Sequence, residues 1–185
     1  MAKMSWAQRR LRFQKMRQAV AYHEAGHAVA ARLLDVTIIE AKVRLKRDEP
    51  SIHVQTRSAG DAARGTPGFR KGLEADIQVA LAGGIAQQLY SPRSYHESQV
   101  EDDRQAAASA AIRHCLEPGN GELGSAFRFE GKVPPEAADL VHRLHETTVS
   151  LIRENWHKVE RVAAAFLKHG ELTQADIDAV MMQPA

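Results

Sequence analysis

Two histidines and a glutamate with the spacing HExxH stand near the N-terminal end of the sequence, at His23, Glu24 and His27. On a helix, residues four apart lie one above the other on the same face, so both imidazoles can reach one metal ion at about 2.1 Å. Glu24 lies beside them, where its carboxylate can take a proton from a metal-activated water. The pattern predicts a Zn2+ site for hydrolysis, with Glu24 as the general base.

The residues around this motif predict the helix that it needs. Apolar residues recur there at helical spacing and no proline interrupts them; they are Val20, Ala21, Ala28, Ala31 and Leu34. Gly26 costs about 1 kcal/mol relative to alanine inside a helix, so we expect a neighbouring helix to approach closely there. A second helix is expected from about Arg70 to Tyr90, and its adjacent Gly83 and Gly84 should pack against the HExxH helix.

Composition predicts one compact, mainly helical domain. The chain has 185 residues, of which 44% are hydrophobic and 5% aromatic, which suffices for a sizeable core. The single cysteine, Cys115, excludes an internal disulfide and a cysteine-based zinc site. No apolar run approaches the length of a membrane span and no signal-peptide pattern opens the chain, so we expect a soluble, cytoplasmic protein. The net charge of +2 does not indicate a nucleic-acid partner.

The N-terminal residues are strongly basic, since residues 1–22 contain six lysines and arginines and no acid. Ser5 is a candidate cap for a helix that continues into the HExxH segment. We interpret residues 1–17 as a solvated lead-in helix. Docking on another subunit and a weak contact with an anionic membrane surface are the alternatives.

A small antiparallel sheet is predicted after the first helix, because residues 36–45 and 51–56 are rich in alternating and β-branched residues around a turn-prone 47–50. The second strand is the candidate for binding a substrate backbone by strand addition, through Ile52, His53, Val54, Gln55 and Thr56. A purely structural hairpin is the equal alternative. We interpret His53 as a surface strand residue and not as a metal ligand. Residues 57–68 are predicted to be a loop.

A catalytic zinc site needs a third protein ligand, and residues 91–112 contain the candidates. The segment predicts a loop, an acidic first helical turn and an alanine-rich helix. Acids in a first turn also simply offset the helix dipole. From the residues alone, His96, Glu97, Asp102 and Asp103 all stay open.

The last third of the chain predicts three more helices. Pro134 and Pro135 should start a long amphipathic helix, Gly170 should end its partner, and Thr173 should cap a short last helix.

Three stretches together resemble the peptidase domain of FtsH-type zinc proteases: HEAGHA at 23–28, LAGGIAQQL at 81–89, and the segment around Asp102. The resemblance covers about residues 18–182. It implies a mainly α metallopeptidase domain with a small antiparallel sheet near the active site. It also favours Asp102 as third zinc ligand, with Asp103 as the alternative, because the position of Asp102 relative to the histidines is closer to that in the family.

The resemblance implies a zinc metalloendopeptidase that cuts flexible or unfolded polypeptides without an ATPase module of its own. It further implies a hexameric homo-oligomer and a separate AAA ATPase as partners. Gly84, Gln87 and Gln88 stand where the family has an arginine and two acids, which removes whatever support those charges gave. The alternative function is a zinc-stabilised, proteolytically inactive module that binds polypeptides or caps a ring.

Overall fold

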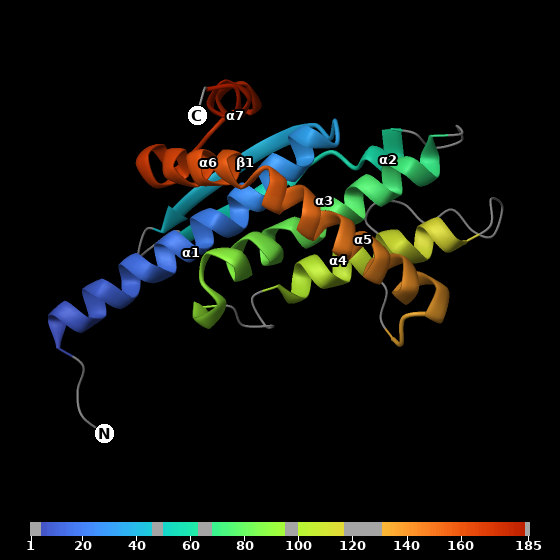
Figure 1. Ribbon diagram of the computed structural model, residues 1–185, viewed down its shortest axis with the longest axis horizontal. Helices are drawn as coiled ribbons and strands as arrows, with labels where there is room; N and C mark the ends of the chain where they lie inside the picture. Colours follow the sequence, from blue (N-terminus) through green and yellow to red (C-terminus); the bar gives the residue numbers. More distant parts are fainter. Residues whose placement is uncertain (1–4, 46–49, 63–67, 95–99, 117–130, 184–185) are drawn as a thin grey trace.

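The computed structural model describes residues 5–45, 50–62, 68–94, 100–116 and 131–183 (Figure 1). Within these ranges the chain is mainly helical and carries one two-stranded antiparallel sheet, which confirms the predicted fold class. The elements in chain order are α1 Trp6–Leu33, β1 Ile38–Leu45, β2 Pro50–Thr56, α2 Ala59–Ala62, α3 Phe69–Tyr90, the 3-10 helix η1 Pro92–Ser94, α4 Glu101–Cys115, α5 Pro135–Glu154, α6 Trp156–His169 and α7 Gln174–Met181.

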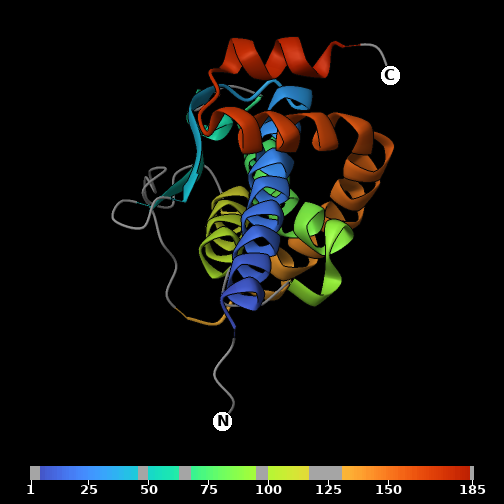
Figure 2. The same ribbon diagram turned by 90° about the vertical axis from the view of Figure 1, so that its left-hand side faces the viewer.

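Helix α1 is the central element of the molecule. It begins with a capping box, in which the Ser5 hydroxyl accepts from the backbone N–H of Gln8 at 3.3 Å and the Gln8 side chain accepts from the N–H of Ser5 at 2.8 Å. Its first turns are exposed, whereas the part from Ala19 onward is largely buried. Figure 1 shows the N-terminal turns extending beyond the other helices, and the buried half lies among α3, α6 and the sheet (Figures 1 and 2).

Two glycines allow α1 and α3 to pack at close range. A Cβ atom on Gly26 would overlap the carbonyl oxygen of Ala82 and lie 2.7 Å from the Cβ of Ala86. A Cβ atom on Gly83 would overlap the ring of His27. The expected close approach of a helix at Gly26 is confirmed, and so is the expected packing of Gly83 against the HExxH helix. Gly84, which was expected to pack there too, instead borders a groove between α3, α4 and α5. Helix α3 therefore packs directly against the part of α1 that carries the HExxH motif.

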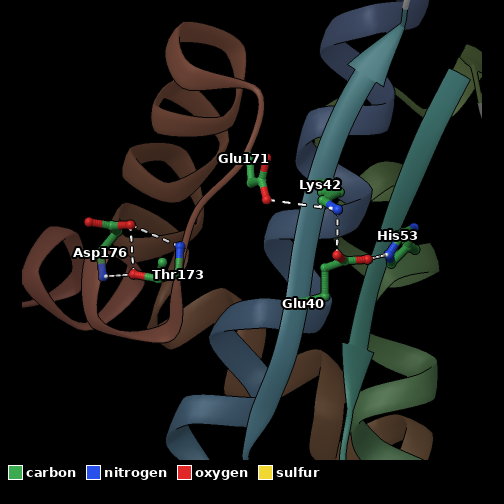
Figure 3. A network of polar contacts seen from close by, with 6 residues as sticks. All are labelled: Glu40, Lys42, His53, Glu171, Thr173 and Asp176. Carbon is green, nitrogen blue, oxygen red and sulfur yellow. Dashed lines mark hydrogen bonds and ion pairs between the residues drawn. The ribbon is translucent and has the colours of Figure 1, made fainter. Parts of the chain in front are cut away.

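The two edges of the sheet differ in whether they have a partner. Along β1, the Val43 N–H donates to the Gly170 carbonyl at 2.8 Å and the Leu172 N–H donates to the Ala41 carbonyl at 3.1 Å. Figure 3 shows an ion-pair network above this edge, in which Lys42 lies between Glu40 and Glu171. Within the described ranges, no strand pairs with the outer edge of β2.

The backbone groups that β2 presents to this open edge follow from the register. Backbone N–H and C=O groups of successive strand residues point to alternate sides. Since Val43 bonds away from β2, its neighbour Lys42 faces β2 and is paired there with His53. The backbone groups of Ile52 and Val54, on either side of His53, therefore point to the open edge.

The caps predicted for the C-terminal helices are confirmed. Helix α5 begins at Pro135, and α6 ends at Gly170, whose φ of 76° is the left-handed conformation that glycine adopts without strain. Thr173 and Asp176 form a capping box at the start of α7 (Figure 3). The prediction of a loop over 57–68 is wrong in part, because Ala59–Ala62 forms the short helix α2; residues 63–67 lie outside the described residues. None of the described helices is long and apolar enough to cross a membrane.

Candidate metal centre

The two motif histidines and one aspartate of α4 converge on one point. The Nε2 atoms of His23 and His27 lie 3.1 Å apart, and the Asp103 Oδ2 atom lies 3.0 Å from His23 Nε2 and 3.4 Å from His27 Nε2. Both histidines and Glu24 are buried, with exposed fractions of 9%, 7% and 5%. Among the described residues, His23, His27 and Asp103 form the one group of histidine and acidic side chains whose ligand atoms lie close enough together to hold a metal ion.

Helix α3 orients both imidazole rings from behind. His27 Nδ1 lies 2.7 Å from the carbonyl oxygen of Val79, and His23 Nδ1 lies 3.1 Å from the side-chain oxygen of the buried Gln87. A carbonyl oxygen only accepts, so each Nδ1 carries the proton and donates it. When the rings are neutral, both Nε2 atoms therefore present lone pairs towards Asp103. This is the tautomer that a metal-binding histidine needs.

The side chains of His23, His27 and Asp103 are suited to bind a cation. Asp103 Oδ2 is buried and accepts no hydrogen bond of good geometry among the described residues. With neutral rings, three electron-pair donors would face one another at hydrogen-bonding distance with no hydrogen between them. Such an arrangement is unfavourable unless a proton or a metal ion lies between the donors. Two imidazole nitrogens and one carboxylate are a donor set that zinc binds in catalytic sites.

The acid that meets the histidines is Asp103, whereas the sequence favoured Asp102. Asp103 is half-buried and contacts both rings, while Asp102 is exposed, although it borders the same cleft. Adjacent helical residues point about 100° apart, so only one of the two can face α1. Spacing to a distant motif does not resolve this one-residue choice, because the rotation of α4 against α1 and α3 decides it. His96 and Glu97 lie outside the described residues.

Without a metal ion, the cluster holds a proton instead. Burial by itself would lower the pKa of His27, but the neighbouring Asp103 carboxylate outweighs it and raises that pKa to about 9. Burial would also raise the pKa of Asp103, but the two histidines hold it well below its usual range. Burial raises the pKa of Glu24, and the nearby histidines oppose this rise. A buried carboxylate with a raised pKa binds a proton more tightly, as a general base must.

The cluster lies on the wall of a cleft of about 880 Å³ between α1, β2, α3 and α4. Every predicted substrate-binding residue, from Ile52 to Thr56, borders this cleft, together with the three histidine and aspartate residues and Glu24. The ring Nε2 atom of His53 is hydrogen-bonded to the carboxylate of Glu40 (Figure 3), and the His53 side chain is 40% exposed. The structure thus brings the strand and the histidine cluster into one cleft.

The cleft is also lined by polar residues that the sequence did not mark as functional. The buried Arg113 donates from Nη2 to Asp61 at 2.7 Å. Asp76 of α3 accepts from the Ser58 hydroxyl at 2.6 Å and from the first backbone N–H groups of α2. These contacts hold α2 as a wall of the cleft. No sequence motif marks them, because they join residues far apart in the chain.

Comparison with known proteins finds a distant relation to FtsH. An ATP-dependent zinc metalloprotease FtsH from Lachnoclostridium phytofermentans is 22% identical over 93% of this chain and 31% of its own length. FtsH 2 from a Thermoanaerobacter species is 25% identical over 89% of this chain and 32% of its own length. FtsH 2 from Sphaerobacter thermophilus is 25% identical over 92% of this chain and 28% of its own length. No protein-family model matches the chain.

The alignments therefore cover nearly all of this chain but only a part of each relative. The chain spans about a third or less of the length of the curated relatives that it matches, between 22% and 32%. A relation to a zinc metalloprotease agrees with the histidine and aspartate cluster.

Proposed function

We propose that the protein is a zinc-dependent endopeptidase that cuts flexible or unfolded polypeptides. The observation that carries this proposal is the convergence of His23, His27 and Asp103 with Glu24 beside them in one cleft. In this proposal the first three residues hold the zinc ion. Bound there, zinc supplies Lewis acidity, which polarises a peptide carbonyl and lowers the pKa of a water molecule towards about 7.

The chain's own residues provide the proton transfers and the orientation. Glu24 accepts the proton of the attacking water and later delivers it to the leaving amine. The Val79 carbonyl and Gln87 keep both histidines in the tautomer with a free Nε2 atom. Gln87 does this without a negative charge, in the place where the resemblance implies an acid.

We further propose that the substrate lies along the open edge of β2 as an added strand. The backbone groups of Ile52 and Val54 point to that edge, and both residues border the cleft that contains Glu24. The other sheet edge already bonds to the segment from Gly170 to Leu172, so β2 is the edge that can accept a strand. A homo-oligomer and a separate AAA ATPase belong to the same proposal, and they rest on the resemblance to FtsH-type proteases alone.

The test is casein cleavage by the purified chain with one equivalent of zinc, next to the Glu24→Gln variant, with zinc content measured for both. We expect both proteins to hold zinc and only the unchanged chain to cut, with a loss of at least about 100-fold in the variant, because the amide cannot take a proton. Cleavage by Glu24→Gln would refute Glu24 as the base. Zinc in both proteins without cleavage in either would favour the inactive polypeptide-binding module, which the distant relation to FtsH also allows.

A further inference from the structure

The N-terminal part of α1 carries large apolar side chains that the rest of the molecule leaves exposed. Trp6 is 73% exposed, Phe13 is 47% exposed and Met16 is 43% exposed. Figure 1 shows this part of α1 extending beyond the other helices. A short helical segment without tertiary contacts is only marginally stable in water. Formation of the helix therefore does not account for the large apolar side chains that this segment carries.

These side chains lie on the same face of α1 as the metal centre. At about 100° per residue, Trp6, Phe13, Met16, Val20, His23 and His27 fall within a sector of about 100° around the helix. Val20 is half-buried and borders the cleft together with Ile52. The apolar stripe formed by Trp6, Phe13 and Met16 therefore continues along one helix face into the cleft.

The charge of this segment is of one sign. Between Trp6 and Tyr22 the chain has no acid, and its cations are Arg9, Arg10, Arg12, Lys15 and Arg17. Arg10 stacks over the Trp6 ring at 5.5 Å, and Arg17 donates to the Leu167 carbonyl, which ties the base of the segment to α6. An anchored apolar stripe among cations complements a polypeptide with apolar and acidic residues.

We propose that this stripe is a docking surface for the part of the polypeptide substrate that extends out of the cleft. Trp6 lies about 25 Å along the helix from His23, which an extended chain of about eight residues would cover. The surface would thus select long, unfolded substrates containing apolar and acidic residues over short peptides. This inference rests on the proposed peptidase function and adds a preference for substrate length and composition.

Continuity with the cleft favours a polypeptide over a lipid surface. A helix that lies on a membrane needs a broad apolar face with cations on the opposite side. Here Arg9 falls within the apolar stripe, while Leu11, which is 53% exposed, lies on the opposite side of α1. The apolar residues that do share a face lead to Glu24.

The test uses the zinc-loaded full chain carrying Glu24→Gln, so that binding is measured without cleavage. The probes are fluorescein-labelled peptides with the repeat Gly-Ser-Glu-Phe-Leu, one of about 20 residues that spans cleft and stripe and one of a single repeat that fits within the cleft. The stripe variant is Phe13→Ser with Met16→Ser, and the matched control is Leu11→Ser. Zinc content and melting temperature are recorded for each variant to establish that it is folded.

We expect the stripe variant to bind the long peptide about tenfold more weakly, because two apolar contacts are lost. The short peptide should bind equally well to all variants, and Leu11→Ser should change neither Kd by more than about twofold. In the chain that retains Glu24, the stripe variant should raise KM for the long peptide and leave kcat unchanged.

Three results would overturn the docking surface: a long-peptide Kd that does not change, an equal loss with Leu11→Ser, or stripe-dependent self-association or binding to phosphatidylglycerol vesicles without an effect on peptide. The peptidase proposal fails separately. If short peptides are cut with no dependence on length, the peptidase stands and the surface fails. If nothing is cut but the long peptide still needs the stripe, the surface stands and the peptidase fails.

Discussion

At the scale of single residues, the protonation of the histidine rings in the candidate metal centre determines how it would take up a metal ion. The Nδ1 atoms of His23 and His27 donate to oxygens of α3, so one further cation is needed between the two Nε2 atoms and Asp103. In the metal-free protein that cation is a proton, which the Asp103 carboxylate holds on His27 with a pKa of about 9. Zinc must displace this proton, so its binding is coupled to pH.

The neighbouring acids Asp103 and Asp102 form a matched pair for testing the third ligand. Asp103→Asn should weaken zinc binding by about 100-fold or more, because a neutral amide replaces a carboxylate that contacts both rings. Asp102→Asn should leave the zinc Kd within about threefold, since this exposed carboxylate is not part of the cluster. Both are measured by competition with a chromophoric chelator. Loss of zinc from Asp102→Asn with retention by Asp103→Asn would reverse the assignment.

At the scale of secondary structure, the close packing of α3 against α1 holds the histidines in place. The same helix supplies both hydrogen-bond acceptors to the rings and, at Gly83, the space for the His27 imidazole. Position and orientation of the two histidine rings therefore depend on one interface. Adding a single methyl group at that interface should therefore displace the histidine rings of the candidate metal centre.

The adjacent Gly83 and Gly84 test this dependence. Gly83→Ala should lower the free energy of unfolding by about 1–3 kcal/mol, because the new Cβ overlaps the His27 ring. It should also weaken zinc binding. Gly84 borders a different groove, between α3, α4 and α5, so Gly84→Ala should be neutral or stabilise the fold by up to about 1 kcal/mol through helix propensity. Urea unfolding and zinc competition provide both readouts. Equal destabilisation by the two changes would contradict the assigned role of Gly83.

At the scale of the whole molecule, the candidate metal centre joins elements that are distant in sequence. Helices α1, α3 and α4 meet there, and β2 and α2 complete the cleft. Ionisation at this junction should therefore influence the stability of the entire fold. The metal-free protein reports this most directly, since no bound ion then masks the charges.

The stability of the metal-free protein should fall as pH rises from about 6.5 to 9. His27 has a pKa of about 9 in the folded protein against an ordinary value of 6.5, so in this window the folded state binds more protons than the unfolded chain. The favourable contribution is complete below pH 6.5 and is lost through pH 9, to a maximum of about 3 kcal/mol. The measurement is the urea midpoint after removal of metal by a chelator, at several pH values across this window.

The Asp103→Asn variant is the control for this dependence on pH. Removing the carboxylate removes the interaction that raises the pKa of His27, so the slope between pH 6.5 and 9 should flatten. Zinc-loaded protein should likewise show little slope in this window, because both rings are then neutral ligands. A metal-free protein whose urea midpoint rises over the same window would contradict the assigned protonation state.

Local sequence was sufficient for the HExxH helix, the hairpin and the caps of the long helices, although it missed the short helix α2. The HExxH spacing placed His23 and His27 on one face, because helical periodicity is a property of the backbone. The capping residues Ser5 and Thr173 and the C-terminal Gly170 marked helix ends correctly, since each acts on its own turn. The alternating residues of β1 and β2 indicated the hairpin for the same reason.

Tertiary packing decided what depends on how elements are rotated and spaced. A one-residue step turns a helix by about 100°, so only the docking of α4 selects Asp103 over Asp102. The contacts of Gln87 and Val79 with the histidine rings, and the closure of the β1 edge by the segment from Gly170 to Leu172, join residues that no local pattern connects. The sequence supplies the residue types of the candidate metal centre, and the packing of α1, α3 and α4 determines which side chains meet there.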